Sequence, residues 1–300
     1  MDLARELAGT DADILAEEPL SGHTTWRIGG PARWFCRVRT EEAASRVLSA
    51  AAREGHPLAI LGMGSNILVA DEGFPGAVLR LEGDFLKVVI EGERLRAGGG
   101  AALGGVCAAA ARSGLSGIEA ISGIPSSIGG AVRINAGAYG GEIFDVLESV
   151  RLLSRRGDRR EARASEIPHG YRWSALCDTR EIVAQATLAL RNAPREQIEE
   201  KTRSVADKRR GALPSEPNAG SVFKNPPGEF AGRLIEACGL KGAREGGAAI
   251  SERHANVIVN RGGACAADVL VLMRRMRDAV RERFGITLSP EVEMLGVRWE

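Results

Sequence analysis

The sequence has no long apolar run, no closely spaced cysteines and almost no net charge. Its 300 residues hold 40 Lys plus Arg against 39 Asp plus Glu. This balance removes any bulk electrostatic case for binding nucleic acid or an anionic membrane surface. No stretch is long and apolar enough to span a bilayer, and the acidic, amphipathic N-terminus fits neither a secretory signal nor a membrane anchor. We therefore expect no membrane or nucleic-acid partner, and any anion must be bound by a local site.

Cysteine and histidine are scattered along the chain. The five cysteines form no CxxC pair, which argues against a disulfide framework and a zinc site, so we expect no metal and a reducing, cytoplasmic location. They are Cys36, Cys107, Cys177, Cys238 and Cys265. The four histidines are His23, His56, His169 and His254. We interpret all of them except His254 as surface or structural residues.

Two common nucleotide-binding signatures are missing as well. The sequence contains no GxxxxGK[ST] run, which argues against a P-loop hydrolase. The segment LGMGSN at 61–66 fails the GxGxxG fingerprint because Ile67 takes the sixth position and no helix is expected after it. The segment GGGAALGG after Arg96 has closer spacing but follows a hairpin strand. Taken singly, each glycine loop is explained by a tight turn.

The length predicts two or three lobes that share a site. Elements expected in the first lobe are an N-terminal helix, a strand within 26–38, a helix over 40–55, and a strand over 57–69 that runs into a loop. Thr40 is placed to cap that helix and Gly55 to end it. Elements expected in the second lobe are a hairpin over 87–100, an Ala-rich helix over 101–114, a hairpin over 148–164, and a strand over 181–191.

A connecting helix over 194–214 leads to the rest of the chain, which we interpret as a third lobe. Its expected elements are a helix over 230–239, a strand over 255–260, a helix from about Ala266 to Phe284, and a final strand over 291–297. The long helix is amphipathic, because its apolar residues recur on one face. They are Val269, Leu272, Met273, Met276 and Val280.

The stretch GIPSSIGGAVRINAGAYGG, at 123–141, is too glycine-rich to predict a stable helix and too long for an ordinary turn. Together with the loop at 62–66, it can present many backbone N–H groups to one diphosphate. Phosphate charge is then held without lysines. The pair of loops therefore predicts a large anionic cofactor in a chain with no positive excess.

Six segments occur in the order, and at about the spacing, found in one enzyme family. They are HTTWRIGGPA, LGMGSNILVADEGFPGAVLRL, GLSGIEAISGIPSSIGGAVRINAGAYGGE, GYRWS, AGSVFKNP and SPEVEMLG. On these motifs, from His23 to Gly296, the chain resembles the UDP-N-acetylenolpyruvoylglucosamine reductase (MurB) family. The resemblance implies a flavoprotein that binds FAD noncovalently. It would use NADPH to reduce the enolpyruvyl ether of UDP-N-acetylglucosamine to UDP-N-acetylmuramate in peptidoglycan synthesis.

The resemblance also implies an α+β fold: a two-lobed FAD-binding fold of the PCMH/vanillyl-alcohol-oxidase type, followed by a C-terminal α/β substrate-binding lobe. The expected boundaries are 1–82 and 83–193 for the FAD-binding lobes, and 194–300 for the connecting helix and substrate-binding lobe. The bare backbone would lie along the FAD pyrophosphate and isoalloxazine. The implied cofactor-binding residues are Gly62, Gly64, Ser65, Asn66, Gly123, Ile124, Pro125, Ser127, Gly129, Gly130, Asn135, Gly137 and Tyr139.

Hydride addition to the terminal carbon of an enolpyruvyl group pushes negative charge onto its carboxylate. Such a site needs a fixed cation there and a proton source over the internal carbon. The resemblance assigns these roles to Arg172 in GYRWS and Ser221 in AGSVF, with Glu291 in SPEVEMLG assisting the intermediate. From the residues alone, Arg172 could be a surface arginine and Ser221 a cap or turn serine. Strand alternation cannot separate Glu291 from Glu293.

Further residues match substrate contacts in the family. Asn225 matches a contact to the substrate diphosphate, Lys224 is a helper in the same role, and His254 matches a contact to the uridine nucleotide. The basic cluster at 208–210 is either another helper or a solvated helix end. The substrate is therefore expected to be a small molecule.

The chain departs from the family pattern at Ser126 and at Arg133-Ile134, so the predicted flavin loop carries a charged residue without an assigned role. It also lacks the loop that covers substrate in longer members and resembles the shorter subtype. Two other functions stay open. AGSVFKNP and YRWS argue against an alcohol or lactone oxidase on the same fold. The catalytic set argues against a non-catalytic sugar-nucleotide sensor.

Overall fold

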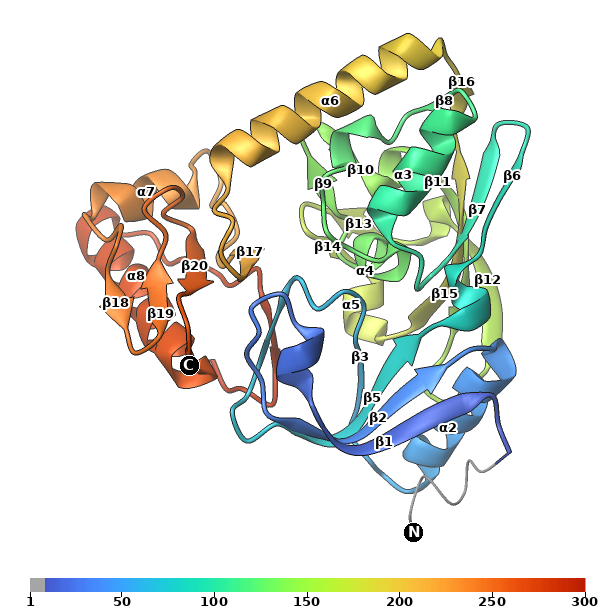
Figure 1. Ribbon diagram of the computed structural model, residues 1–300, viewed down its shortest axis with the longest axis horizontal. Helices are drawn as coiled ribbons and strands as arrows, with labels where there is room; N and C mark the ends of the chain where they lie inside the picture. Colours follow the sequence, from blue (N-terminus) through green and yellow to red (C-terminus); the bar gives the residue numbers. More distant parts are fainter. Residues whose placement is uncertain (1–8, 300) are drawn as a thin grey trace. The chain divides into compact units, whose positions relative to one another are not determined.

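The computed structural model (Figure 1) describes residues 9–299. The chain divides into two compact units, each with its own hydrophobic core. Unit 1 comprises the residues up to Ala16, Trp34–Met63 and Gly76–Arg209. Unit 2 comprises Glu17–Arg33, Gly64–Pro75 and the residues from Arg210 onward. Among the described residues, no helix has the length and apolar character needed to cross a membrane.

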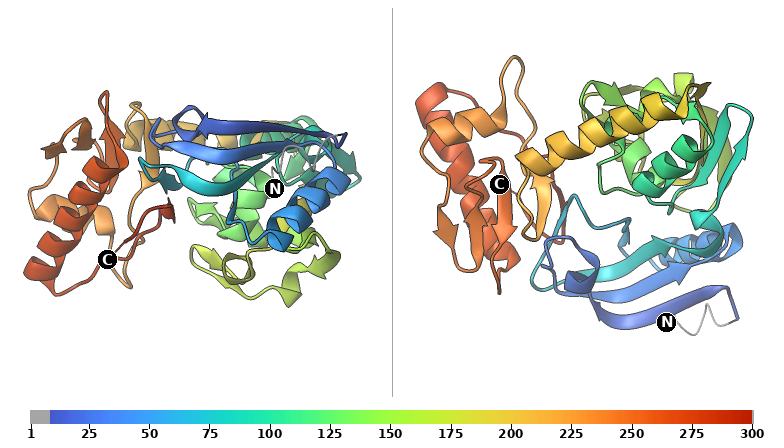
Figure 2. Two further views of the ribbon diagram at one scale, coloured as in Figure 1. Left: turned by 90° about the horizontal axis from the view of Figure 1, so that it is seen from below. Right: turned by 45° about the horizontal axis from the view of Figure 1, so that its top comes forward.

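The first sheet of unit 1 has the strand order β1-β2-β5-β3, with β3 parallel to β5. Its strands are β1 (Ala12–Pro19), β2 (Pro31–Val38), β3 (Leu58–Ile60) and β5 (Phe74–Leu81). Helix α2 (Glu41–Arg53) lies against one face of this sheet, where its buried side chains join the strand residues in one hydrophobic cluster (Figure 2). The helix begins as predicted, because the Thr40 hydroxyl accepts a hydrogen bond from Ala43 N at 3.2 Å.

The expected N-terminal helix is wrong where the structure describes it. Residues 1–8 of that segment lie outside the described residues, and Ala12–Pro19 form strand β1. Ala12 and Ile14, two positions apart, both pack on the cluster that α2 covers. This burial with a period of two is that of a strand, so pairing with β2 outweighs the amphipathic helical pattern.

The second sheet of unit 1 is antiparallel, in the order β12-β11-β15-β7-β6. The two predicted hairpins and the predicted closing strand supply all five strands. They are β6 (Val88–Glu91), β7 (Arg94–Gly98), β11 (Leu147–Leu153), β12 (Arg159–Arg163) and β15 (Ile182–Ala189). Helices α3 (Leu103–Arg112) and α4 (Ile128–Arg133) join this sheet in a second hydrophobic cluster.

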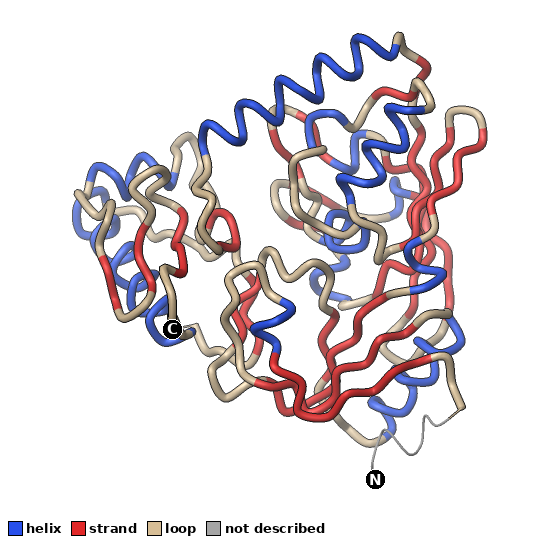
Figure 3. Tube along the Cα trace, viewed as in Figure 1, coloured by secondary structure: helices blue, strands red, loops and turns tan. Residues whose placement is uncertain are grey.

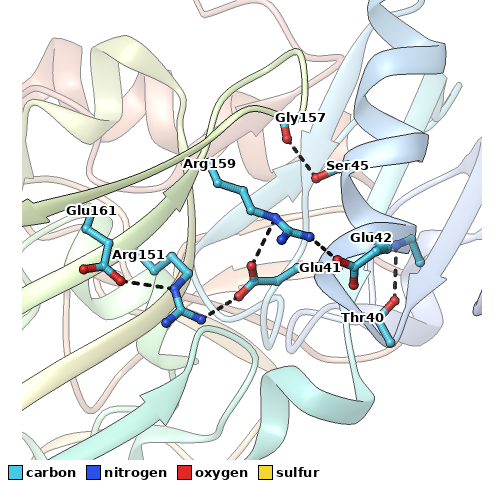
Figure 4. Close-up of polar contacts among 9 residues, drawn as sticks. Thr40, Glu41, Glu42, Ser45, Arg151, Gly157, Arg159 and Glu161 are labelled. Carbon is cyan, nitrogen blue, oxygen red and sulfur yellow. Dashed lines mark hydrogen bonds and ion pairs between the residues drawn. The ribbon is translucent and has the colours of Figure 1, made fainter.

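Polar contacts connect α2 with the β11–β12 hairpin (Figure 4). Arg151 donates to Glu41 at 3.0 Å, and Arg159 forms ion pairs with both Glu41 and Glu42. The turn of the hairpin lies on the helix, where Ser45 Oγ donates to Gly157 O at 2.8 Å. Two segments far apart in the sequence are thereby fixed to each other within unit 1.

The glycine stretch contains a helix that its composition argued against. Helix α4 forms because Ser127 caps it, with the hydroxyl accepting from Gly130 N at 3.2 Å, and because Ile128, Ala131 and Val132 are fully buried. Tertiary burial and a cap therefore outweigh the poor helix propensity of Gly129 and Gly130.

The remaining elements of unit 1 are short, apart from helix α6 (Arg195–Ala212). This is the long blue helix of Figure 3, and its last turn belongs to unit 2. The short elements are α5 (Leu176–Thr179), β8 (Leu115–Ser116), β9 (Gly137–Ala138), β10 (Gly141–Glu142), β13 (His169–Gly170), β14 (Trp173–Ser174), β16 (Arg191–Asn192), and the 3-10 turns η2 (Gly83–Leu86), η3 (Glu119–Ile121), η4 (Ile143–Asp145) and η5 (Ala164–Glu166).

Unit 2 contains an antiparallel sheet of order β17-β20-β19-β18 and a parallel pair, β4 with β21. Helix α8 (Ala266–Phe284) has the predicted bounds, and its five predicted apolar side chains are fully buried in the core of this unit. The other elements are β4 (Ile67–Val69), β17 (Asn218–Ser221), β18 (Arg244–Glu245), β19 (Ala248–Ile250), β20 (Val257–Asn260), β21 (Glu293–Leu295), α7 (Ala231–Ala237) and η1 (Leu20–His23).

Candidate functional site

Two glycine-rich segments of unit 1 meet at Ser127. A Cβ placed on Gly62 would lie 2.5 Å from Ser127 Oγ, the atom that caps α4. Two residues after Ser127, Gly129 N donates to Gly99 O at 2.8 Å, and a Cβ on Gly99 would lie 1.8 Å from Val183 O. The structure thus brings the predicted cofactor residues Gly62, Ser127 and Gly129 together, and gives Gly99 a packing role.

The backbone N–H groups of the two predicted cofactor loops are used to different extents. In the glycine stretch, the N–H groups of Ile124, Ser126, Ile128, Gly129 and Gly130 all donate to acceptors within unit 1. In the loop at 62–66, no acceptor among residues 9–299 binds the N–H groups of residues 62–64 and 66. The N–H groups of Gly123 and Ser127 likewise have no acceptor among the described residues. Both loops therefore keep open donors of the kind that an anion requires.

Arg172 lies on the glycine stretch. Its Nη2 donates to Gly137 O at 2.7 Å, and its Nη1 would lie 3.2 Å from a Cβ on Gly137. The side chain is half-buried, and its guanidinium carbon lies 5.0 Å from the centre of the Tyr171 ring. The contact with this carbonyl orients the guanidinium.

Asn135 is fully buried at φ +45° and holds the glycine stretch through side-chain hydrogen bonds. Its Nδ2 donates to Glu142 Oε2 at 2.7 Å and to Gly170 O at 3.1 Å, while its Oδ1 accepts from Phe144 N at 3.4 Å. Gly170 begins the turn that carries Arg172. Asn135 therefore shapes the surface on which Arg172 lies.

Arg209 of α6 also contacts the glycine stretch. A Cβ on Gly123 would lie 2.9 Å from Arg209 Cδ, and burial lowers the pKa of the guanidinium, with the half-exposed Tyr139 acting in the opposite direction. Among the described residues, no side chain forms an ion pair with Arg209. The sequence analysis places Arg209 in one basic cluster with Lys208 and Arg210. Arg209 lies four residues after the buried Val205, however, so it shares the buried face of the helix.

Unit 2 brings Ser221 and Glu291 onto neighbouring segments. Ser221 ends β17 opposite Val257, and the next carbonyl, that of Val222, accepts from Glu291 N at 2.9 Å. The Ser221 side chain is half-buried, and its hydroxyl caps no N–H group within residues 9–299. Ser221 is therefore the last residue of a strand and does not cap a helix.

Asn66, in the predicted cofactor loop at 62–66, bonds to the same segment. Its Nδ2 donates to Glu291 O at 3.1 Å, and its carbonyl accepts from Glu293 N at 3.0 Å. Glu293 lies in β21, opposite Ile67, whereas Glu291 bonds to the residue after Ser221. Main-chain pairing therefore distinguishes the two glutamates, which alternation alone left equivalent.

The predicted substrate residues lie around α7 in unit 2. Asn225 Oδ1 accepts from Ala231 N at 3.0 Å, and the imidazole of His254 packs on Gly232, where a Cβ would lie 3.3 Å from Cε1. Burial lowers the pKa of His254, and its Nδ1 accepts from Asn256 N at 3.3 Å. The neutral ring therefore carries its proton on Nε2 and offers a fixed donor.

The chain is similar over nearly its whole length to reductases of one family. A family model described as "FAD binding domain" matches residues 32–163, and one described as "UDP-N-acetylenolpyruvoylglucosamine reductase, C-terminal domain" matches residues 213–295. UDP-N-acetylenolpyruvoylglucosamine reductase 2 of Symbiobacterium thermophilum is 46% identical over 94% of this chain and 92% of its own. The Moorella thermoacetica reductase is 46% identical over 98% and 97%. A crystal structure of the Thermus caldophilus enzyme matches with a TM-score of 0.82, at 41% identity over 94% of this chain and 98% of that chain.

Proposed function

Because the chain belongs to the UDP-N-acetylenolpyruvoylglucosamine reductase family, we propose that it reduces the enolpyruvyl ether of UDP-N-acetylglucosamine to UDP-N-acetylmuramate. It is an FAD-dependent oxidoreductase of peptidoglycan precursor synthesis, with NADPH as hydride donor. The observation that carries the proposal is the placement of Ser221 beside Glu291, with the Asn66 loop bonded to the same segment.

The residues present fit FAD. The loop at 62–66 has open N–H donors for a diphosphate. Gly62 lies so close to Ser127 that a side chain at position 62 would fill the space between the two loops. Arg209 adds a partly buried cation beside Gly123. When bound, FAD carries the hydride from NADPH to the enolpyruvyl group. The other predicted cofactor residues, Gly64, Ser65, Ile124, Pro125 and Tyr139, lie on these same two loops.

Arg172 binds the substrate carboxylate in this proposal. Negative charge grows on that carboxylate as hydride arrives at the terminal carbon, and a guanidinium can bind both of its oxygens. The contact with Gly137 O supports this role, because it fixes the guanidinium before substrate binds. A preorganised cation costs little reorganisation during the reaction.

Ser221 donates the proton to the internal carbon. A serine hydroxyl is a weak acid, so it suits only a strongly basic carbon in a site shielded from water. Glu291 assists by sharing that proton or by ordering water at the same place. The main-chain bond between Val222 and Glu291 supports this pairing.

Lys224, Asn225 and the Nε2–H group of His254 hold the nucleotide of the substrate. We further propose lobes at 1–82, 83–193 and 194–300, and the two separate hydrophobic clusters of unit 1 support the first two. A cytoplasmic location, without membrane or nucleic-acid partners, is proposed on the five free cysteines and the near-zero net charge.

A visible absorption spectrum of the purified protein tests the function. Acid denaturation should release all of the flavin into solution, because FAD is held noncovalently. NADPH should bleach the bound flavin in the absence of oxygen, and the enolpyruvyl substrate should restore its colour. A yellow protein that NADPH does not bleach would indicate a sensor, and one reoxidised only by oxygen would indicate an oxidase.

A further inference from the structure

The segment that carries Ser221 leaves the regular strand ladder. Strands β17 and β20 pair at Asn218 with Val259 and at Ser221 with Val257, so the register shifts between these pairs. Gly220, inside the shift, has φ +73°. Beyond Ser221 the chain lacks regular pairing with β20, and another group must hold it.

A single side chain replaces the missing strand partner. Asn256 is 2% exposed; its Oδ1 accepts from Phe223 N at 3.0 Å, and its Nδ2 donates to Phe223 O at 2.8 Å. Its own carbonyl accepts from Val222 N at 2.9 Å. An amide can accept and donate in one plane as a peptide group does, so both backbone groups of buried Phe223 are satisfied.

The same residue contacts a second predicted site residue. The backbone N–H of Asn256 donates to His254 Nδ1 at 3.3 Å. From the opposite side, Val222 O accepts from Glu291 N, and Lys224 N donates to Ser289 O, both at 2.9 Å. The backbone after Ser221 is thus fixed between Asn256 and the Ser289–Glu291 segment.

We propose that Asn256 is a positioning residue for proton donation by Ser221, a role that rests on the function proposed above. The amide holds Phe223 two residues from the donor and thereby sets where the serine hydroxyl lies. Misplacement of a reacting group by about 1 Å costs up to roughly a hundredfold in rate. Loss of the amide should therefore slow the proton-dependent step far more than hydride transfer from NADPH.

Aspartate at this position gives a specific test. An ionised carboxylate can accept from Phe223 N but cannot donate to Phe223 O, whereas a protonated carboxyl can do both. Two titratable residues contact Asn256 or the backbone that it holds. His254 accepts from the Asn256 N–H through Nδ1, and the backbone N–H of Glu291 donates to Val222 O. Asn256→Asp should therefore be slow at neutral pH and recover as the pH falls, beyond the change that the wild-type enzyme shows.

The two half-reactions of the FAD-loaded enzyme are measured separately by stopped-flow absorbance. In Asn256→Asp, flavin bleaching by NADPH should stay near the wild-type rate, while reoxidation by the enolpyruvyl substrate falls about tenfold to a hundredfold at neutral pH. Asn256→Ser, which replaces the amide with a shorter hydroxyl side chain that does not titrate in this range, should be slowed without recovery at low pH.

Asn260, the last residue of β20, provides the matched control. Its Nδ2 donates to Trp26 O at 2.9 Å and its Oδ1 accepts from Gly262 N at 2.8 Å, away from Phe223. Asn260→Asp should lower stability without slowing reoxidation selectively. Two results would overturn the positioning role of Asn256. One is equal slowing of both half-reactions in Asn256→Asp and Asn256→Ser, and the other is the same recovery at low pH in Asn260→Asp. A wild-type enzyme that the substrate never reoxidises would instead overturn the proposed function itself.

Discussion

Replacing Gly62 with alanine tests whether close packing of the two glycine segments shapes the cofactor site. The new Cβ would lie 2.5 Å from Ser127 Oγ and 3.4 Å from Ser127 Cβ. Gly62 has no positive φ, so the backbone accepts alanine without strain. The conflict is therefore with one hydroxyl oxygen, and it is relieved when that oxygen moves away.

The magnitude follows from what this oxygen does. Ser127 Oγ caps α4 through Gly130 N, and losing such a cap costs about 1 kcal/mol. Gly62→Ala should therefore lower the free energy of unfolding by about 1 kcal/mol, because the hydroxyl must leave its capping position. Ser127→Ala should cost a similar amount directly. In the double variant the second change costs little, since the hydroxyl is already gone and the remaining 3.4 Å contact is ordinary.

Urea unfolding at saturating FAD, followed by far-UV circular dichroism, measures this cycle. The coupling between the two substitutions should be about 1 kcal/mol, which is above the 0.3–0.5 kcal/mol at which distant sites are roughly additive. Gly105→Ala, at a position where a Cβ meets nothing within 4 Å, is the matched control and should not couple to Ser127→Ala. Additive effects of Gly62→Ala and Ser127→Ala would refute the contact.

Three more outcomes are expected. Ser221→Ala should leave flavin reduction by NADPH intact and slow reoxidation at least roughly a hundredfold, with partial recovery in Ser221→Cys; stopped-flow rates that fall equally in both half-reactions would remove Ser221 from the mechanism. Arg209→Gln should weaken FAD binding by about 1.5–3 kcal/mol, measured by titration of the apoprotein, whereas the exposed Lys208→Gln should not. Gly157 has φ +90°, and a Cβ there would lie 2.6 Å from Ser45 O, so Gly157→Ala should lower the free energy of unfolding in urea by about 1–3 kcal/mol. Arg159→Ala removes only exposed ion pairs and should lower it by about 0.2–1 kcal/mol. A larger loss in Arg159→Ala than in Gly157→Ala would contradict the importance of the turn contact.

Most helices and hairpins could be predicted because their signals are local. Helix α8 has the predicted bounds, since its apolar residues repeat on one face and Gly285 follows at φ +69°. Helix α4 could not be predicted, because its stability comes from burial of Ile128 and Val132 and from a cap whose geometry depends on the fold. Strand β1 was mistaken for helix because a pairing with β2 is invisible in an isolated segment.

The candidate site residues rest on family motifs more than on local physics. Nothing in the segments around Ser221 and Glu291 indicates that they pair, because their contact runs through Val222 O in a folded unit 2. Asn256 gives no sequence signal either, since its role depends on the register shift at Gly220. Arg209 is different: counting four residues from Val205 along a charged helix would have placed it on the buried face.

The near-zero net charge of the chain hides strong local differences in how its arginines are used. On the surface, Arg159 and Arg160 pair with carboxylates, so their charges are largely cancelled and add little field. On the glycine stretch, Gly137 O orients Arg172, and burial lowers the pKa of Arg209 beside Gly123. A partly desolvated guanidinium interacts more strongly with an anion than a solvated one, because the local dielectric is lower. In the proposed function, anion binding therefore depends on local cations and open N–H groups, and an overall positive charge is not required.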